Sequence, residues 1–116
     1  MPDQLSQKFA ALADPTRRAM LVRLSAGQAS VSDIAEPFLK RMSLPAVTKH
    51  LQVLEKAGLV TKTRDAQRRL CDLNPEGFRD TVEFLDQYRQ MWEESLDRLG
   101  AYLKTVTQKN KSSRRK

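Results

Sequence analysis

Residues 43–58 constrain the fold more than any other stretch, because both ends of a short amphipathic helix are marked there. Ser43 is a favourable N-cap, Pro45 falls in the first turn, where its missing N–H costs nothing, and Gly58 can end the helix. Apolar residues recur between these signals at helical spacing and predict one buried stripe. They are Val47, Leu51 and Leu54. The opposite face suits either a DNA major groove or solvent. It carries Pro45, Thr48, Lys49, Gln52 and Lys56, with Ala46 and Val53 beside them.

Two helices are predicted near the start of the chain. Apolar residues at i, i+4 and i+7 indicate a first helix over residues 4–12. Asp14 as cap and Pro15 at the first helical position begin a second helix, which Gly27 ends.

A third, brief helix is predicted directly before residue 43. A short extended piece at residues 30–31 leads into it, with Ser32 or Asp33 as N-cap and Pro37 limiting its length. A short helix, a tight turn and a second amphipathic helix form a helix-turn-helix pattern.

The periodicity changes after Gly58 and predicts a two-stranded wing. Residues 59–64 are rich in β-branched side chains, residues 65–68 resemble a turn, and residues 69–73 resemble a returning strand. Because an isolated hairpin is only marginally stable, this one is expected to lean on the helices. Its basic side chains suit contact with phosphate groups. They are Lys62, Arg64, Arg68 and Arg69.

The last helix is predicted to begin at Asn74-Pro75 and to run to about Thr107, a length of ~50 Å. Its apolar residues follow alternating spacings of four and three, interrupted at Arg89. Part of this face is expected to pack on the first helix of the same chain, but it exceeds what a small winged domain can cover. We therefore expect a dimer formed through the first and last helices. The expected interface residues are Leu5, Phe9, Leu85, Trp92, Leu96, Leu99 and Leu103.

Composition favours a cytoplasmic, nucleic-acid-binding protein. Its 116 residues suit a single domain, predicted over residues 1–107, with a basic tail at 108–116 that is too polar to fold. The net charge of +7 favours an anionic partner, and no apolar run is long enough to span a membrane. The acidic side chains concentrate at residues 75–103, which hold seven of them against three basic ones. The first residues lack a signal-peptide pattern, and a single cysteine excludes an internal disulfide framework.

Three segments together carry a resemblance to a known family. They are Ala-Asp-Pro-Thr-Arg-Arg at 13–18, Leu-Pro-Ala-Val-Thr-Lys-His-Leu at 44–51 and Leu-Glu-Lys-Ala-Gly-Leu-Val at 54–60. They resemble the ArsR/SmtB family of winged helix-turn-helix repressors, over about residues 5–103. The resemblance implies a mainly α fold with a small β-hairpin wing, which forms a dimer. It also implies that residues 43–57 are the recognition helix and that the protein represses an operator until a ligand or metal releases it.

The sequence departs from the family at its metal sites. Metal-sensing members carry a Cys-Val-Cys-Asp-Leu type sequence before the recognition helix, whereas residues 30–35 here are Ser-Val-Ser-Asp-Ile-Ala. Neutral serine is a poor ligand for soft metals. The family's other site uses Asp and His on the last helix, and the one histidine of this chain is His50. We therefore expect neither metal nor cofactor, as in the branch that does not sense metals, and an inducer of unknown identity stays open.

The candidate DNA-binding residues come from the recognition face and the wing. They are Ser43, Pro45, Ala46, Thr48, Lys49, His50, Gln52, Lys62, Arg64, Arg68 and Arg69. Lys49 and Gln52 could contact purine edges or phosphates. His50 is expected to pack between helices or contact phosphate, Cys71 to be a packed side chain, and Arg17 and Arg18 either to be solvated or to touch phosphate.

An enzyme is not expected, because the chain has one histidine, one cysteine, no glycine-rich phosphate loop and no isolated carboxylate pair. The chosen function is a sequence-specific DNA-binding regulator, a dimeric repressor of a palindromic operator. The alternatives are an architectural protein that binds DNA without sequence preference and a winged module that binds protein. A specific repressor is distinguished by its preference for a palindromic site.

Overall fold

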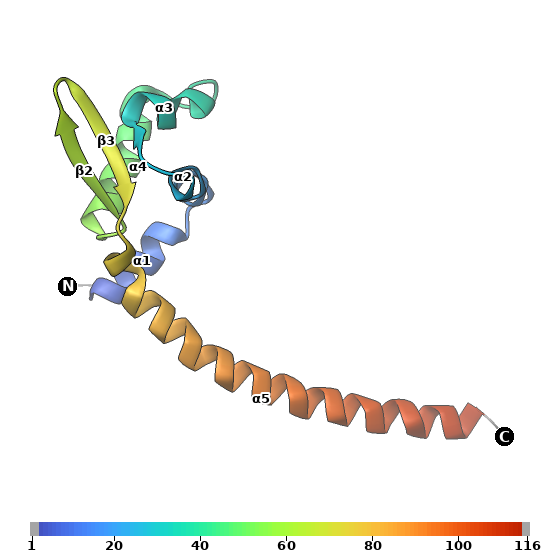
Figure 1. Cartoon of the computed structure of the whole chain (residues 1–116). Coiled ribbons are helices and arrows are strands. Elements are labelled where there is room, and N and C mark those ends of the chain that lie inside the picture. The colour runs from blue at the N-terminus through green and yellow to red at the C-terminus, as the bar shows by residue number, and fades with distance from the viewer. Residues whose placement is uncertain (1–2, 115–116) are drawn as a thin grey trace. The chain divides into compact units, whose positions relative to one another are not determined.

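The computed structural model describes residues 3–114, with side chains described as far as residue 108. Its elements are α1 (Gln4–Leu12), α2 (Pro15–Ser25), β1 (Ala29–Ser30), α3 (Val31–Ala35), the 3₁₀ helix η1 (Glu36–Phe38), α4 (Leu44–Lys56), β2 (Val60–Asp65), β3 (Arg68–Leu73) and α5 (Pro75–Arg114). Figure 1 labels these elements along the chain. The chain divides into two units, residues 1–81 and residues 82–116. We call the first unit the winged body.

Two helices of the winged body begin at the side-chain caps that the sequence predicts. Asp14 accepts from the N–H groups of Thr16 and Arg17 at 2.7 and 3.2 Å, which begins α2. Ser43 accepts from the N–H of Ala46 at 3.3 Å and begins α4. The bounds of α1 also match the predicted residues 4–12.

The N-cap of α3 was assigned wrongly from the sequence. Ser30 caps this helix, with its hydroxyl accepting from the N–H of Asp33 at 3.1 Å, so Ser32 and Asp33 lie inside the first turn. Val31, predicted to be extended, is the first helical residue, and the extended piece is Ala29–Ser30. Several serine and aspartate residues in succession can each cap a helix, and sequence alone does not choose among them.

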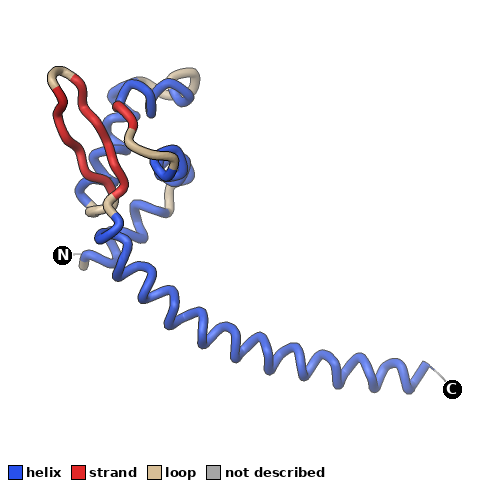
Figure 2. Tube along the Cα trace, viewed as in Figure 1, coloured by secondary structure: helices blue, strands red, loops and turns tan. Residues whose placement is uncertain are grey.

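The sheet has three strands rather than the predicted two. β3 lies between β1 and β2 and is antiparallel to both, with Ala29 opposite Cys71 and Val60 opposite Leu73. Figure 2 shows the long β2–β3 hairpin and the short third strand in red. Arg68 and Asp65 pair as strand residues, so the predicted four-residue turn is shortened to Ala66 and Gln67. The pairing of β1 explains how the hairpin is anchored to the helices.

The core lies where α2, α3 and α4 pack against the sheet. Val47, Leu51 and Leu54 of α4 have no exposed surface, which confirms the stripe predicted from their spacing. Cys71 is likewise fully buried, as predicted for a packed side chain. The other large, fully buried side chains are Met20, Ile34, Leu59 and Val60. Burying such side chains supplies most of the free energy of folding.

α5 begins at Pro75 as predicted but continues to Arg114, seven residues beyond the predicted end at Thr107. The backbone of residues 108–114 is therefore helical, whereas the sequence predicted an unfolded tail from residue 108. Residues 115 and 116 of that tail lie outside the described residues. Whether the domain ends at residue 107 stays a prediction. None of the helices within residues 3–114 is long and apolar enough to cross a membrane.

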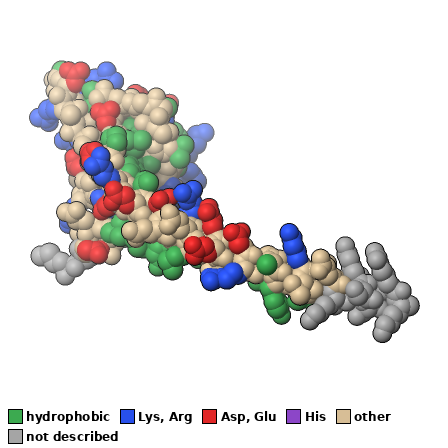
Figure 3. All heavy atoms as spheres, turned by 60° about the horizontal axis from the view of Figure 1, so that its bottom comes forward, with side chains coloured by type: hydrophobic (Ala, Val, Ile, Leu, Met, Phe, Trp, Pro, Cys, Tyr) green, Lys and Arg blue, Asp and Glu red, His purple; other side chains and the backbone are tan. Residues whose placement is uncertain are grey.

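Within its own unit, α5 from residue 82 exposes a row of large apolar side chains. Hydrophobic side chains are visible along this helix in Figure 3, together with acidic ones. The exposed fractions lie between 44 and 64%. The residues are Val82, Leu85, Tyr88, Met91, Trp92, Leu96, Leu99, Tyr102 and Leu103.

Candidate nucleic-acid interface

The outward face of α4 presents hydrogen-bonding groups in front of a rigid, buried back. Lys49 and Gln52 are exposed, and Thr48 is partly exposed, while the residues on the other side of the helix are fully buried. A helix of this width fits the major groove, where amide, hydroxyl and ammonium groups can bond base edges. Pro45 is exposed and Ala46 partly exposed at the start of the same face. The structure therefore presents five of the predicted DNA-binding residues on or beside one surface of α4.

Three arginines of the wing are exposed, as the sequence predicts. Arg64 lies opposite Arg69 in the β2–β3 ladder, and Arg68 lies opposite Asp65 next to the turn. Antiparallel pairing brings Arg64 and Arg69 together, and like charges opposite each other are unfavourable without an anion nearby. Phosphate groups would supply that anion.

Two hollows join the wing to α4. One, of about 340 Å³, is lined by Gln52, Glu55, Lys62, Thr63, Arg64 and Arg69. The other, of about 490 Å³, is lined by residues 30–33, Leu44, Thr48, Gln67, Arg68 and Arg69. Arg69 is common to both, Gln52 borders the first and Thr48 borders the second. The recognition face and the wing therefore belong to one continuous surface.

Lys62 differs from the other wing cations. Only 17% of its side chain is exposed, and its ammonium group lies 3.9 Å from a carboxylate oxygen of Glu55. An opposite charge at this distance reduces the attraction of Lys62 for a phosphate. The structure thus directs Lys62 of β2 toward Glu55 of α4. That Lys62 binds DNA stays a prediction.

His50 lies between helices rather than on the outward face. Its ring nitrogen Nδ1 is 3.2 Å from Nη1 of Arg17, and the residue is partly buried. Because a guanidinium can only donate, Nδ1 is the acceptor and Nε2 carries the proton. This geometry corresponds to helix packing, one of the two roles expected for His50.

Arg17 has a structural role that the sequence did not reveal. Its Nε donates to the carbonyl oxygen of Ala11 at 2.7 Å and its Nη2 to that of Ala10 at 3.1 Å. Arg18 donates to the carbonyl oxygen of Leu12 at 2.7 Å. The last four carbonyls of a helix lack the usual partner four residues later. The arginines donate to three of them, and the carbonyl of Ala10 also accepts from the N–H of Ala13 at 3.2 Å. A pair of arginines soon after a helix end is the only sequence signal for this role.

Asp14 completes the connection between α1 and α2. Partial burial raises the pKa of its carboxyl group, but the N–H groups of Arg17 and Thr16 donate to the carboxylate. The charge of Arg17 acts in the same direction, and the pKa of Asp14 is lowered overall. The segment at residues 13–18 therefore serves to hold α1, α2 and α4 together.

Among the residues that the structure describes, no three His, Cys, Asp or Glu side chains are grouped so that they could hold a metal ion. Ser30 and Ser32, where metal-sensing relatives carry thiolates, border the larger hollow with Asp33. The expectation that the protein does not sense metal remains a prediction.

A helix-turn-helix, a basic wing beside it and a continuous polar and basic surface define a winged helix-turn-helix regulator that binds DNA. Residues 12–63 match the protein-family model described as a helix-turn-helix domain. The transcriptional repressor SdpR of Bacillus subtilis (strain 168) is 32% identical over 81 residues, which are 70% of this chain and 88% of that protein. The chain belongs to the ArsR family of transcriptional regulators.

Two solved structures extend the comparison. The crystal structure of the ArsR family transcriptional regulator RHA00566 matches with a TM-score of 0.71 and a sequence identity of 42%. The match covers 78% of this chain and 98% of the RHA00566 chain. The solution structure of the homodimeric winged helix-turn-helix DNA-binding domain of Mb0332 from Mycobacterium bovis is 28% identical, with a TM-score of 0.59. The match covers 81% of this chain and 82% of the Mb0332 chain.

Proposed function

We propose that the protein is a dimeric transcriptional repressor that recognises a palindromic operator in the cytoplasm. The observation that carries the proposal is the continuous surface formed by Thr48, Gln52 and the wing arginines around the two hollows. The related SdpR is a transcriptional repressor, and the domain of Mb0332 is homodimeric. In a dimer, two α4 helices would enter successive major grooves, with half-site centres ~34–36 Å apart.

The exposed apolar row of α5 supports the dimer. Large contiguous apolar surfaces are uncommon on monomers and mark sites of association. Five of the seven predicted interface residues belong to this row, each with about half or more of its surface exposed. They are Leu85, Trp92, Leu96, Leu99 and Leu103. Leu5 and Phe9 of α1 are partly buried within the winged body.

The proposed mechanism separates base recognition from backbone binding. Lys49 and Gln52 would contact base edges, while Arg64, Arg68 and Arg69 would bind phosphates beside the groove. Bound in this way across a promoter, the dimer would block access to it. Ser43 would support the helix as its N-cap.

The test is a titration of the protein against DNA from upstream of its own gene and against a scrambled duplex, at two salt concentrations. A specific repressor is expected to prefer the natural fragment by ~10³-fold or more. Both affinities should fall with salt because phosphate contacts release counterions. Equal binding to both duplexes would indicate an architectural protein and overturn the proposal.

A further inference from the structure

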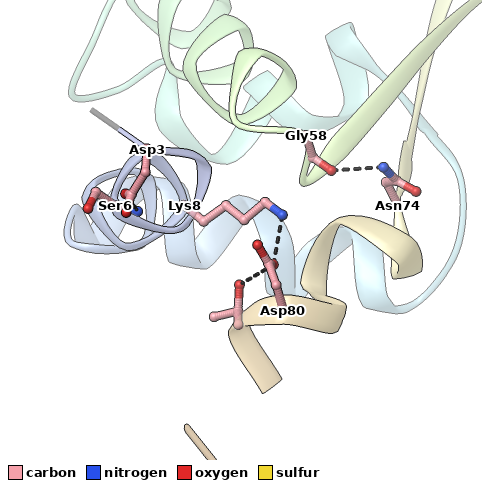
Figure 4. A network of polar contacts seen from close by, with 7 residues as sticks. Asp3, Ser6, Lys8, Gly58, Asn74 and Asp80 are labelled. Atoms are coloured by element: carbon pink, nitrogen blue, oxygen red, sulfur yellow. Dashed lines mark hydrogen bonds and ion pairs between the residues drawn. The ribbon is translucent and has the colours of Figure 1, made fainter. Parts of the chain in front are cut away.

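The turn that follows the recognition helix α4 is hydrogen-bonded directly to the residue before α5. Gly58 follows the last residues of α4 and has a φ of +82°, a conformation that favours glycine. Its carbonyl oxygen accepts a hydrogen bond of 2.8 Å from Nδ2 of Asn74, and the N–H of Asn74 donates to the carbonyl of Leu59 at 2.9 Å. Figure 4 shows the Asn74 amide pointing at Gly58. Asn74 thus directs its side chain to the α4–β2 turn.

The backbones of α5 and the α4–β2 turn also meet without a side chain between them. A Cβ added at Gly77 would overlap the carbonyl oxygen of Gly58 and would lie 2.8 Å from its carbonyl carbon. Because both groups are backbone, neither can move aside as a flexible side chain could. Gly77 is therefore the residue that permits this close approach.

An ion pair holds the next turn of α5. Nζ of Lys8 lies 2.8 Å from Oδ1 of Asp80, and the Lys8 side chain is only 9% exposed. Thr81 is buried, and its hydroxyl donates to the same oxygen at 3.4 Å. The hydrogen bond from Lys8 lowers the pKa of Asp80, so this carboxyl group is ionised at neutral pH. Figure 4 shows Lys8 reaching from α1 to Asp80.

We infer that these contacts form a joint that sets the half-site spacing the dimer accepts. The joint consists of Gly58, Asn74 and Gly77 together with the Lys8–Asp80 pair. It ties the first two turns of α5, the helix expected to form the dimer, to Gly58 in the turn after the recognition helix α4. Any rotation of α4 about this point changes the separation of the two α4 helices on DNA. This inference rests on the dimeric repressor proposed above.

The joint makes Gly77 and Asn74 positioning residues for DNA recognition, although neither belongs to the outward face of α4. Removing the contact at Gly58 leaves the base-contacting side chains of each α4 unchanged. The loss of this contact affects only how the two α4 helices of a dimer are held at the same time. Binding to one half-site and binding to two half-sites at a fixed distance therefore respond differently, which a general loss of stability would not produce.

The experiment uses synthetic duplexes that carry the two half-sites footprinted upstream of the protein's own gene. One duplex keeps the natural spacing, two have it changed by one base pair in either direction, and one carries a single half-site. The variants are Gly77→Ala, Asn74→Ala and the charge exchange Lys8→Asp with Asp80→Lys. Gly100→Ala is the matched control, because a Cβ at Gly100 meets no atom within 4 Å. Sedimentation measures the dimer in every case.

Gly77→Ala and Asn74→Ala are expected to dimerise and to bind the single half-site within about threefold of wild type. Their preference for the natural spacing is expected to fall at least tenfold, whereas Gly100→Ala and the charge exchange keep it. An unchanged preference in both variants, or an equal loss on all duplexes, overturns the joint. If Gly77→Ala does not fold, the same criteria are applied to Asn74→Ala and to the single variant Asp80→Lys. A wild-type protein that is monomeric or indifferent to spacing overturns the proposed function itself, and the joint with it.

Discussion

Replacing Leu99 by alanine tests the role of α5 in association. Leu99 lies in the exposed apolar row of α5 and has 50% of its surface exposed. Alanine is the strongest helix former, so the substitution shortens the side chain without disturbing the helix. In a twofold dimer the change is made twice. The variant therefore measures how much this position contributes to the interface.

The expected effect follows from the exposed fraction of Leu99. Burying a leucine side chain completely contributes about 1.5–3 kcal/mol. With half of the surface still to be buried on association, each copy contributes about 1 kcal/mol and the pair about 2 kcal/mol. The dissociation constant of the dimer should therefore rise about 30-fold.

Sedimentation equilibrium over a range of concentrations measures this constant directly. Leu39 provides the matched control, because it is 49% exposed in the winged body and outside the proposed interface. Leu39→Ala should leave the dissociation constant within twofold of wild type. If Leu99→Ala changes it as little as the control does, or if both variants change it equally, the assignment of the α5 face is wrong.

Three further outcomes follow from the winged body. Arg17→Met should lower the free energy of unfolding by about 1–2 kcal/mol in urea titrations. The loss should exceed that of Arg18→Met, because Arg17 donates to two carbonyl oxygens at the end of α1 and Arg18 donates to one. The pKa of Asp80 is lowered in the folded protein, so its contribution to stability is complete above about pH 4 and is lost as the pH falls further. The stability difference between wild type and Asp80→Asn should accordingly shrink between pH 6 and pH 3, and a difference that grows would refute the ion pair. Burial raises the pKa of the Cys71 thiol, so alkylation at pH 8 followed by mass spectrometry should be at least about tenfold slower in the folded protein than in urea.

The local features of the fold could be predicted from the sequence because neighbouring residues determine them. Asp14 and Ser43 precede proline-containing first turns, and both cap their helices as predicted. The spacing of Val47, Leu51 and Leu54 predicted correctly which side of α4 is buried, and therefore which side faces outward.

The features that were missed depend on residues distant in the sequence. The third strand exists because Ala29 and Ser30 pair with β3 some forty residues later, and two residues carry too little pattern to predict this. The contact of Arg17 with His50 and that of Asn74 with Gly58 likewise join separate helices. Lys62 resembles the other wing cations in sequence, and its low exposure and the proximity of Glu55 distinguish it in the structure.

In the proposed dimer, the outward face of α4 recognises bases. The most direct measurement compares the preference for the upstream DNA over a scrambled duplex in wild type, in Lys49→Ala with Gln52→Ala, and in Lys40→Ala as a control for the loss of an exposed lysine. The double variant should remain folded and dimeric while its preference falls at least about 100-fold, and the control should retain the wild-type preference. A double variant that keeps the preference, or that unfolds, would contradict the outward orientation of this face.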